Sequence, residues 1–401
     1  MKQEERMGWS PKRPHGLICS ENNSYGGYTV IVPNGGDHIY LLGPDGQIKH
    51  NWHLPWYKPG YAFLTKSGTL LTRGRLMEQV QGRWEFTPGA DILLELDWDS
   101  NLLWRWEDGD LHHGMQRLPN GNTLIIIWTP LPKGFHQRIN GGMPKEKWDA
   151  LLKADPTFLD FALEGMGVGG RPKMDGEYGD AIIEVNPDGE IVKQWNTFDH
   201  LSPEENPTCS LCPGAEWTHA NSLDLTRSGE VIISFREISK TIIINWESDE
   251  IVWEFGAPVI SHQHDPNETP EGNILIFDNG AHHPIQGRSR IIEVDRKTRK
   301  IVWQWSGDPV FSFRCLHIGG AEKLPNGNYM VCEGECGRLI EVTPDKQICW
   351  EWVSPFVHDF KGKPNIQIFK TRTYAEDSPE LAGRDLSGAD CESINKAYQL
   401  I

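Results

Sequence analysis

The sequence predicts an all-β protein, a six-bladed β-propeller whose blades are four-stranded antiparallel sheets. Three observations predict this fold: a composition rich in tryptophan and turn formers, a repeated strand that ends in an aromatic residue, and a repeated turn centred on glycine. The chain has 401 residues, among them 17 Trp, 41 Gly and 27 Pro. Many aromatic residues together with many turn formers are typical of proteins made of short repeated strands.

The first repeat is a short strand that closes each unit. Apolar residues in most copies alternate with residues of another type, as in a half-buried strand. A turn such as Asn-Pro-Asp-Gly at 186–189 precedes several copies, so each copy is the second strand of a hairpin. The six copies are 48–52, 102–106, 191–195, 251–255, 301–305 and 348–352.

A second hairpin opens most units, and its turn reads Leu-Pro-Asn-Gly-Asn at 118–122 and again at 324–328. Two hairpins give four antiparallel strands, the arrangement of a propeller blade. We expect one propeller domain over residues 1–401. Its blades are expected at about 27–56, 60–108, 112–198, 219–257, 262–307 and 315–356.

The first unit lacks an opening strand. Residues 28–32, 38–42 and 48–52 offer three strands, and the segment 365–370 after the last blade is the expected fourth. Pairing these segments would close the ring between N- and C-terminal strands and would remove exposed sheet edges.

An insertion at about 129–179 interrupts the third blade, and residues 144–152 and 158–163 within it have helical patterns. Long loops inside a compact fold are often functional, so one interpretation is a lid over the site. The alternative is a structural cap on the outer rim.

Charge excludes several classes of partner. Lys and Arg number 39 against 56 Asp and Glu, which gives a net charge of −17. This balance argues against binding to nucleic acid or to anionic membranes. No apolar run approaches the roughly 20 residues of a membrane helix, and the charged N-terminus lacks the apolar region of a secretory signal. We therefore expect a cytoplasmic protein.

Histidines recur where four of the blades begin, and the opening strands of a propeller line its central channel. Buried neutral imidazoles need hydrogen-bond partners, so packing alone does not explain four of them at matching positions. We expect these side chains to reach one small ligand. They are His113, His219, His264 and His317.

Several motifs resemble the bacterial arylsulfotransferase family. They include Gln-His-Asp at 263–265, the run at 272–280, Thr-His-Ala-Asn-Ser-Leu at 218–223, and the tail at 373–386. The resemblance extends from about residue 25 to 386, and blade five carries the most specific part. It implies a six-bladed propeller, in agreement with the repeats.

The resemblance also implies a reaction, the transfer of a sulfuryl group from an aryl sulfate to a phenol through a sulfohistidine, without a cofactor. His219 and His264 match the family's channel histidines, Arg290 lies where a sulfate-binding arginine is expected, and His317 is the candidate nucleophile. Imidazole is a good nucleophile near neutral pH, and cationic groups can hold the sulfuryl oxygens. The remaining substrate-binding candidates are His113, Asn221, Arg288 and Glu216. For both arginines the alternative is a solvated charge at a strand end.

A second interpretation comes from the surplus of imidazoles, including His282 and His283. Three or four histidines at the axis would suit one transition-metal ion, and such a centre could serve a lyase, a hydrolase or an oxygenase. The ligands would be His113, His219, His264 and His317. Glu216, Glu322 and Glu333 would then act as supporting groups or bases.

Four of the eight cysteines form two close pairs, Cys209 with Cys212 and Cys332 with Cys336. The first pair resembles a metal-binding turn, but it supplies only two ligands. We expect structural thiols or a local disulfide rather than a site completed by the second pair.

Overall fold

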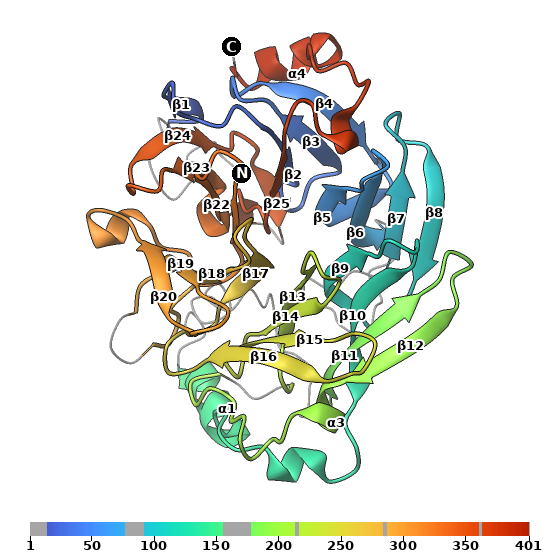
Figure 1. Ribbon diagram of the computed structural model, residues 1–401, viewed down its shortest axis with the longest axis vertical. Helices are drawn as coiled ribbons and strands as arrows, with labels where there is room; N and C mark the ends of the chain where they lie inside the picture. Colours follow the sequence, from blue (N-terminus) through green and yellow to red (C-terminus); the bar gives the residue numbers. More distant parts are fainter. Residues whose placement is uncertain are drawn as a thin grey trace. The chain divides into compact units, whose positions relative to one another are not determined.

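The computed structural model describes residues 14–76, 92–154, 178–212, 216–283, 287–360 and 363–400. Six antiparallel sheets of four or five strands dominate it, so the predicted all-β, six-bladed propeller is confirmed (Figure 1). The chain divides into two compact units, each with its own core. Unit 1 contains Met1–Glu78, Leu93–Arg105 and Ile318–Ile401, and unit 2 contains Gln79–Ile92 and Trp106–His317.

Unit 2 carries three four-stranded sheets in chain order, coloured from teal through yellow to orange in Figure 1. The third blade consists of β9 (Leu111–Arg117), β10 (Thr123–Pro130), β11 (Tyr178–Val185) and β12 (Ile191–Asn196). The fourth consists of β13 (Ala220–Leu225), β14 (Val231–Phe235), β15 (Lys240–Ile244) and β16 (Ile251–Gly256). The fifth consists of β17 (His264–Glu268), β18 (Ile274–Asp278), β19 (Arg290–Val294) and β20 (Ile301–Trp305).

Unit 1 carries the other blades. The first pairs β27 (Arg372–Tyr374) with β2 (Tyr28–Ile31), β3 (His38–Leu42) and β4 (Ile48–His53). The second consists of β5 (Tyr57–Leu64), β6 (Leu70–Leu76), β7 (Ile92–Leu96) and β8 (Leu102–Glu107). The sixth has five strands, β21 (Gly320–Lys323), β22 (Tyr329–Glu333), β23 (Arg338–Val342), β24 (Ile348–Val353) and β1 (Gly16–Ser20). The edge strand β1 had no counterpart among the expected strands.

The opening strand of the first blade comes from the C-terminal part of the chain, but not from the expected segment 365–370. Tyr28 pairs with Tyr374 and Val30 with Arg372, whereas Ile368 makes only an isolated bridge to Pro33. The apolar pattern at 366–369 reflects burial, since Ile368 is fully buried, and does not mark the paired strand. The polar strand that follows it forms the ladder.

Short helices complete the described chain. The helix expected at 144–152 lies at α1 (Lys145–Ala154), between β10 and β11 of the third blade. The expected helix at 158–163 lies outside the described residues. The other helical segments are η2 (Phe135–Arg138), α3 (Thr197–His200), η3 (Val310–Ser312), η4 (Gly334–Cys336), η5 (Pro379–Leu381), η6 (Ala389–Cys391) and α4 (Glu392–Ala397), and a small hairpin joins β25 (His358–Phe360) to β26 (Lys363–Asn365).

The repeated turn and the repeated tryptophan have clear structural causes. Gly121 and Gly327 both turn the chain with a φ near 90°, at 90° and 88°, a conformation that favours glycine. Several closing tryptophans form a hydrogen bond to the next blade. Trp195 Nε1 donates to Asp249 O at 3.4 Å, and Trp253 Nε1 donates to Arg296 O at 3.0 Å. In unit 1, Trp52 and Trp352 donate in the same way to Asp97 O and Gly46 O. The indole therefore fixes the spacing of neighbouring blades.

Candidate functional site

The histidines of unit 2 lie where the opening strands depart from regular pairing. Strand β13 contacts both β9 and β17, so the three strand starts are neighbours. The register of each strand against its partner shifts at this end, which indicates β-bulges. His113, His219 and Asp265 have φ values of 42°, 59° and 49°, in the left-handed region. Such conformations cost about 1–3 kcal/mol each and are frequent at functional sites.

His219 forms a buried contact with an acid. Its Nδ1 hydrogen-bonds to Oε1 of Glu216, whose second oxygen accepts a hydrogen bond from Trp128 Nε1. The ring of His113 meets the ring of His219 edge-on at 4.8 Å. Burial acts to lower the pKa of His219, but the charge of Glu216 and its hydrogen bond together outweigh burial, so the pKa is raised. The arrangement favours the protonated, cationic form of His219, in which Nδ1 donates its hydrogen bond to Glu216.

The surroundings of His264 favour the neutral imidazole, in contrast to those of His219. Its Nδ1 lies 2.7 Å from Asn279 Oδ1, and the Asn279 amide nitrogen donates to Cys315 O at 2.8 Å. The second bond fixes the orientation of the amide, so Nδ1 of His264 must be the protonated nitrogen. Burial lowers the pKa of His264 well below its ordinary value, and the nearby charges of Arg236, His317 and His219 act in the same direction. A neutral His264 therefore carries its lone pair on Nε2.

The remaining predicted site residues lie in unit 2 with different surroundings. His317 is buried, with 4% of its surface exposed. Asn221 donates its amide to Gln263 O at 2.8 Å. Arg290 is also buried, and its guanidinium donates to Asp278 Oδ2 at 2.8 Å and to Val259 O at 2.6 Å. Arg288 is partly buried.

Sequence reasoning missed two charged partners of this histidine cluster. Arg236, after β14, is 2% exposed and donates to Glu237 Oε1 at 2.5 Å, and its backbone NH donates to His219 O. Its charge influences the pKa of His219 and of His264, so it is a buried cation beside both rings. No motif marks it, because it lies at the far end of the neighbouring strand.

Asp180 is the second missed partner. One of its oxygens lies 3.2 Å from His112 Nε2, and the other accepts hydrogen bonds from Thr218 N and Oγ1 at 3.0 and 2.7 Å. Burial acts to raise the pKa of Asp180, but the contacts with His112 and Thr218 leave it lowered. His112 Nδ1 lies 2.9 Å from His113 Nδ1, so this carboxylate holds the first histidine pair in place.

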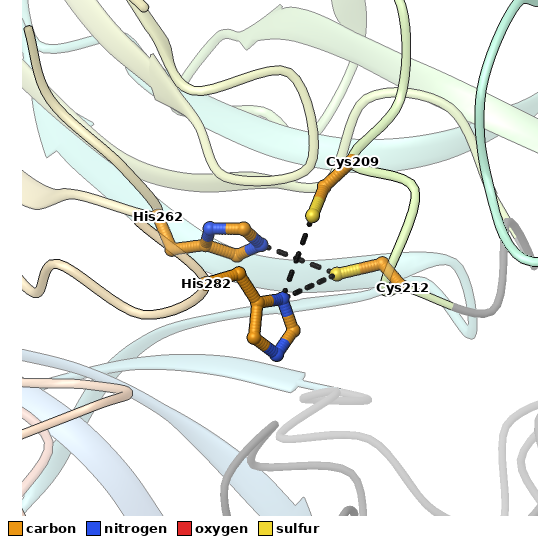
Figure 2. Close-up of side chains that lie close together, drawn as sticks. All are labelled: Cys209, Cys212, His262 and His282. Atoms are coloured by element: carbon orange, nitrogen blue, oxygen red, sulfur yellow. Dashed lines mark hydrogen bonds between the residues drawn. The ribbon is translucent and has the colours of Figure 1, made fainter. Parts of the chain in front are cut away.

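A separate cluster of potential metal ligands lies elsewhere in unit 2. Figure 2 shows Cys209, Cys212, His262 and His282 turned toward one another, and their ligand atoms all lie within 4.8 Å of each other. Among described residues, the only other such group is Asp37, His38 and His53. The four histidines expected as axial metal ligands do not form a group of this kind in the described part of the chain. Cys332 and Cys336 are free thiols outside both groups.

The fold and the cluster define a β-propeller with a buried, hydrogen-bonded histidine centre. Residues 163–355 match the family model described as Arylsulfotransferase (ASST), which confirms the family resemblance over this span. The span includes His219, His264, Arg290 and His317. No curated protein sequence matches the chain significantly.

The fold is shared with a solved structure. A protein of unknown function from Bacteroides caccae superposes with a TM-score of 0.51 at 13% identity, covering 87% of this chain and 98% of its own. A streptogramin B lyase gives a TM-score of 0.47 at 12% identity, covering 92% of this chain and 96% of its own. A virginiamycin B lyase from Staphylococcus aureus gives 0.45 at 11% identity, covering 86% and 91%. At 13% identity the likeness to the Bacteroides caccae protein concerns the fold alone. In the described part of the chain, every helix is too short or too polar to cross a membrane.

Proposed function

We propose that the protein transfers a sulfuryl group from an aryl sulfate to a phenol through an imidazole of the His219–His264–His317 cluster. The observation that carries the proposal is the pairing of two buried histidines with opposite preferences within the span that matches the family model. The pKa of His219 is raised beside Glu216, whereas His264 holds its only proton on Nδ1 against Asn279. One group can act as an acid and the other offers a lone pair.

The first half-reaction uses both features. The lone pair of the attacking imidazole nitrogen forms an N–S bond while the S–O bond to the aryl group breaks. The electron pair leaves with the aryl oxygen, which takes a proton from His219. In the second half-reaction the oxygen of the acceptor phenol attacks sulfur, the N–S bond breaks, and His219 recovers a proton from the phenol. Arg236, which is buried and paired with Glu237, would help to balance the negative charge of the sulfuryl oxygens.

Two histidines are candidates for the nucleophile. The family resemblance implies His317. The hydrogen bond from His264 Nδ1 to Asn279 favours His264, because it leaves Nε2 as the unprotonated nitrogen. Arg290 stays a candidate for sulfate binding from the resemblance, although its hydrogen bonds to Asp278 and Val259 already occupy much of its guanidinium.

The test is a transfer assay with p-nitrophenyl sulfate and a phenol acceptor. We expect nitrophenolate release to need both the protein and the acceptor, with ping-pong kinetics because the sulfuryl group waits on the protein between substrates. Intact-mass analysis after the donor alone should show an adduct of sulfuryl mass. The adduct should disappear in either His317→Ala or His264→Ala, whichever removes the nucleophile, and should persist in the control His53→Ala. Folded protein that forms no adduct and transfers no sulfuryl group would contradict the proposal.

A further inference from the structure

The cluster of Cys209, Cys212, His262 and His282 has the composition and spacing of a metal site. Cys212 Sγ lies 3.2 Å from His262 Nε2 and 3.6 Å from His282 Nδ1, and Cys209 Sγ lies 3.5 Å from the same His282 nitrogen. In a tetrahedral zinc site with ordinary Zn–S and Zn–N bonds, sulfur and nitrogen ligands are about 3.6 Å apart. The side chains therefore already stand at the separations that one shared zinc ion would impose.

The surrounding hydrogen bonds determine which nitrogen of His262 is available to bind a metal ion. Ser261 Oγ donates its proton to Ala281 O at 2.6 Å and lies 3.1 Å from His262 Nδ1. The serine oxygen can then only accept from Nδ1, so the proton of a neutral His262 sits on Nδ1. Its Nε2 lone pair points at Cys212 Sγ (Figure 2). A hydrogen bond of this kind to the non-ligating nitrogen is usual for histidines that bind zinc.

Backbone hydrogen bonds also hold the two cysteines in position. Cys212 N donates to Cys209 O at 3.0 Å, which forms a tight Cys-x-x-Cys turn, and Cys209 N donates to Glu237 O at 2.8 Å. Both cysteines are free thiols, and Cys212 and His262 are completely buried. Two thiolates and two neutral imidazoles around a divalent cation have no net charge, which suits such a buried position.

We propose that these four side chains bind one Zn²⁺ in a closed, structural site. Four protein ligands fill a tetrahedral shell and leave no position for substrate, in contrast to catalytic zinc. The ligands come from three segments: the loop that follows α3, the segment just before β17 and the loop that follows β18. The ion would hold these three segments together, and one of its ligands, His262, lies two residues before His264. The proposal does not depend on sulfuryl transfer.

The experiment uses the full chain purified without chelator. Elemental analysis should find one zinc per chain, and replacement by Co²⁺ should give the strong visible absorption of a tetrahedral ion together with a thiolate charge-transfer band. Cys209→Ser and His282→Ala should lose stoichiometric zinc and change the cobalt spectrum. Ser261→Ala, which keeps all ligands, should bind zinc about 10–100-fold more weakly.

Matched controls exist for both ligand types. His283→Ala, next to His282, and Cys336→Ser should retain one zinc per chain. Because the cobalt spectrum is read on the unmutated protein, failure of a variant to fold does not decide the outcome. A disulfide between Cys209 and Cys212 in the purified protein, or the absence of both bound zinc and a tetrahedral cobalt spectrum, would overturn the proposal.

Discussion

His264 Nδ1 and Asn279 Oδ1 lie 2.7 Å apart, and this contact determines which nitrogen of His264 carries the proton. Asn279 cannot rotate its amide without losing the bond to Cys315 O. The residue therefore acts through His264 as a positioning residue.

With His264 as the nucleophile, replacing Asn279 by Ala should lower kcat about tenfold and leave KM nearly unchanged, because one hydrogen bond that selects the reactive tautomer is lost. Steady-state kinetics of sulfuryl transfer measure the effect. Asn273→Ala is the control, since Asn273 bonds to Glu293 in the same blade. Equal losses in both variants would indicate a general effect on the blade and would contradict a role for Asn279 at His264.

The dependence of kcat on pH should show the influence of Glu216 on His219. The groups that act on His219 are Glu216 and Glu237, which raise its pKa, and Arg236, which lowers it, while His113 contacts its ring. A raised pKa keeps the acid protonated to higher pH, and activity should fall as pH rises through it.

Glu216→Gln keeps a hydrogen-bond acceptor for Trp128 but removes the charge. The alkaline limb of the kcat–pH profile should therefore move to lower pH. Glu247→Gln, at an exposed turn, should leave the profile unchanged. An unshifted alkaline limb in Glu216→Gln would show that His219 is not the acid.

The indole of Trp253 should contribute to stability through its hydrogen bond to Arg296 O in the next blade. Trp253→Phe keeps an aromatic ring but removes the donor, and it should lower the free energy of unfolding by about 1–2 kcal/mol. Urea denaturation measures the change. Trp56→Phe, at a side chain that is 42% exposed, should have little effect. If both variants were equally stable, the indole bond would not be what holds these blades together.

The hydroxyl of Tyr374 anchors the strand that completes the first blade. It accepts a hydrogen bond from Leu64 N at 2.8 Å. Tyr374→Phe leaves this backbone NH unpaired and should destabilise the protein by about 1–3 kcal/mol in thermal or urea unfolding. In Tyr398→Phe the ring retains its packing on Phe356, and the change should stay within about 0.5 kcal/mol. If Tyr374→Phe left the stability unchanged, strand pairing alone would hold β27 in place.

Much of the fold follows from local sequence. The closing strands and glycine turns repeat because each blade needs the same hairpins and the same buried tryptophan, so the six blades could be predicted from their period. The strand at 372–374 could not be predicted in this way, because Arg-Thr-Tyr has no apolar pattern. It becomes a strand by pairing with β2.

The site was predictable only in part. Histidines at the start of four blades are visible in the sequence, and the structure places His113 against His219. Arg236 was missed because the two histidines beside it, His219 and His264, belong to other segments of the chain. The sequence showed that Cys209 and Cys212 could supply two metal ligands. The other two, His262 and His282, lie 50 and 70 residues after Cys212, and only the folded structure brings them close.

The pairing of β27 with β2 has a consequence for biosynthesis. Residues 28–31 leave the ribosome long before their partners at 372–374 are made. During translation the first blade must wait, with one strand missing, until residues 372–374 have emerged. Until then its exposed edge would be a segment in need of chaperone protection, because an unpaired strand can pair with other chains.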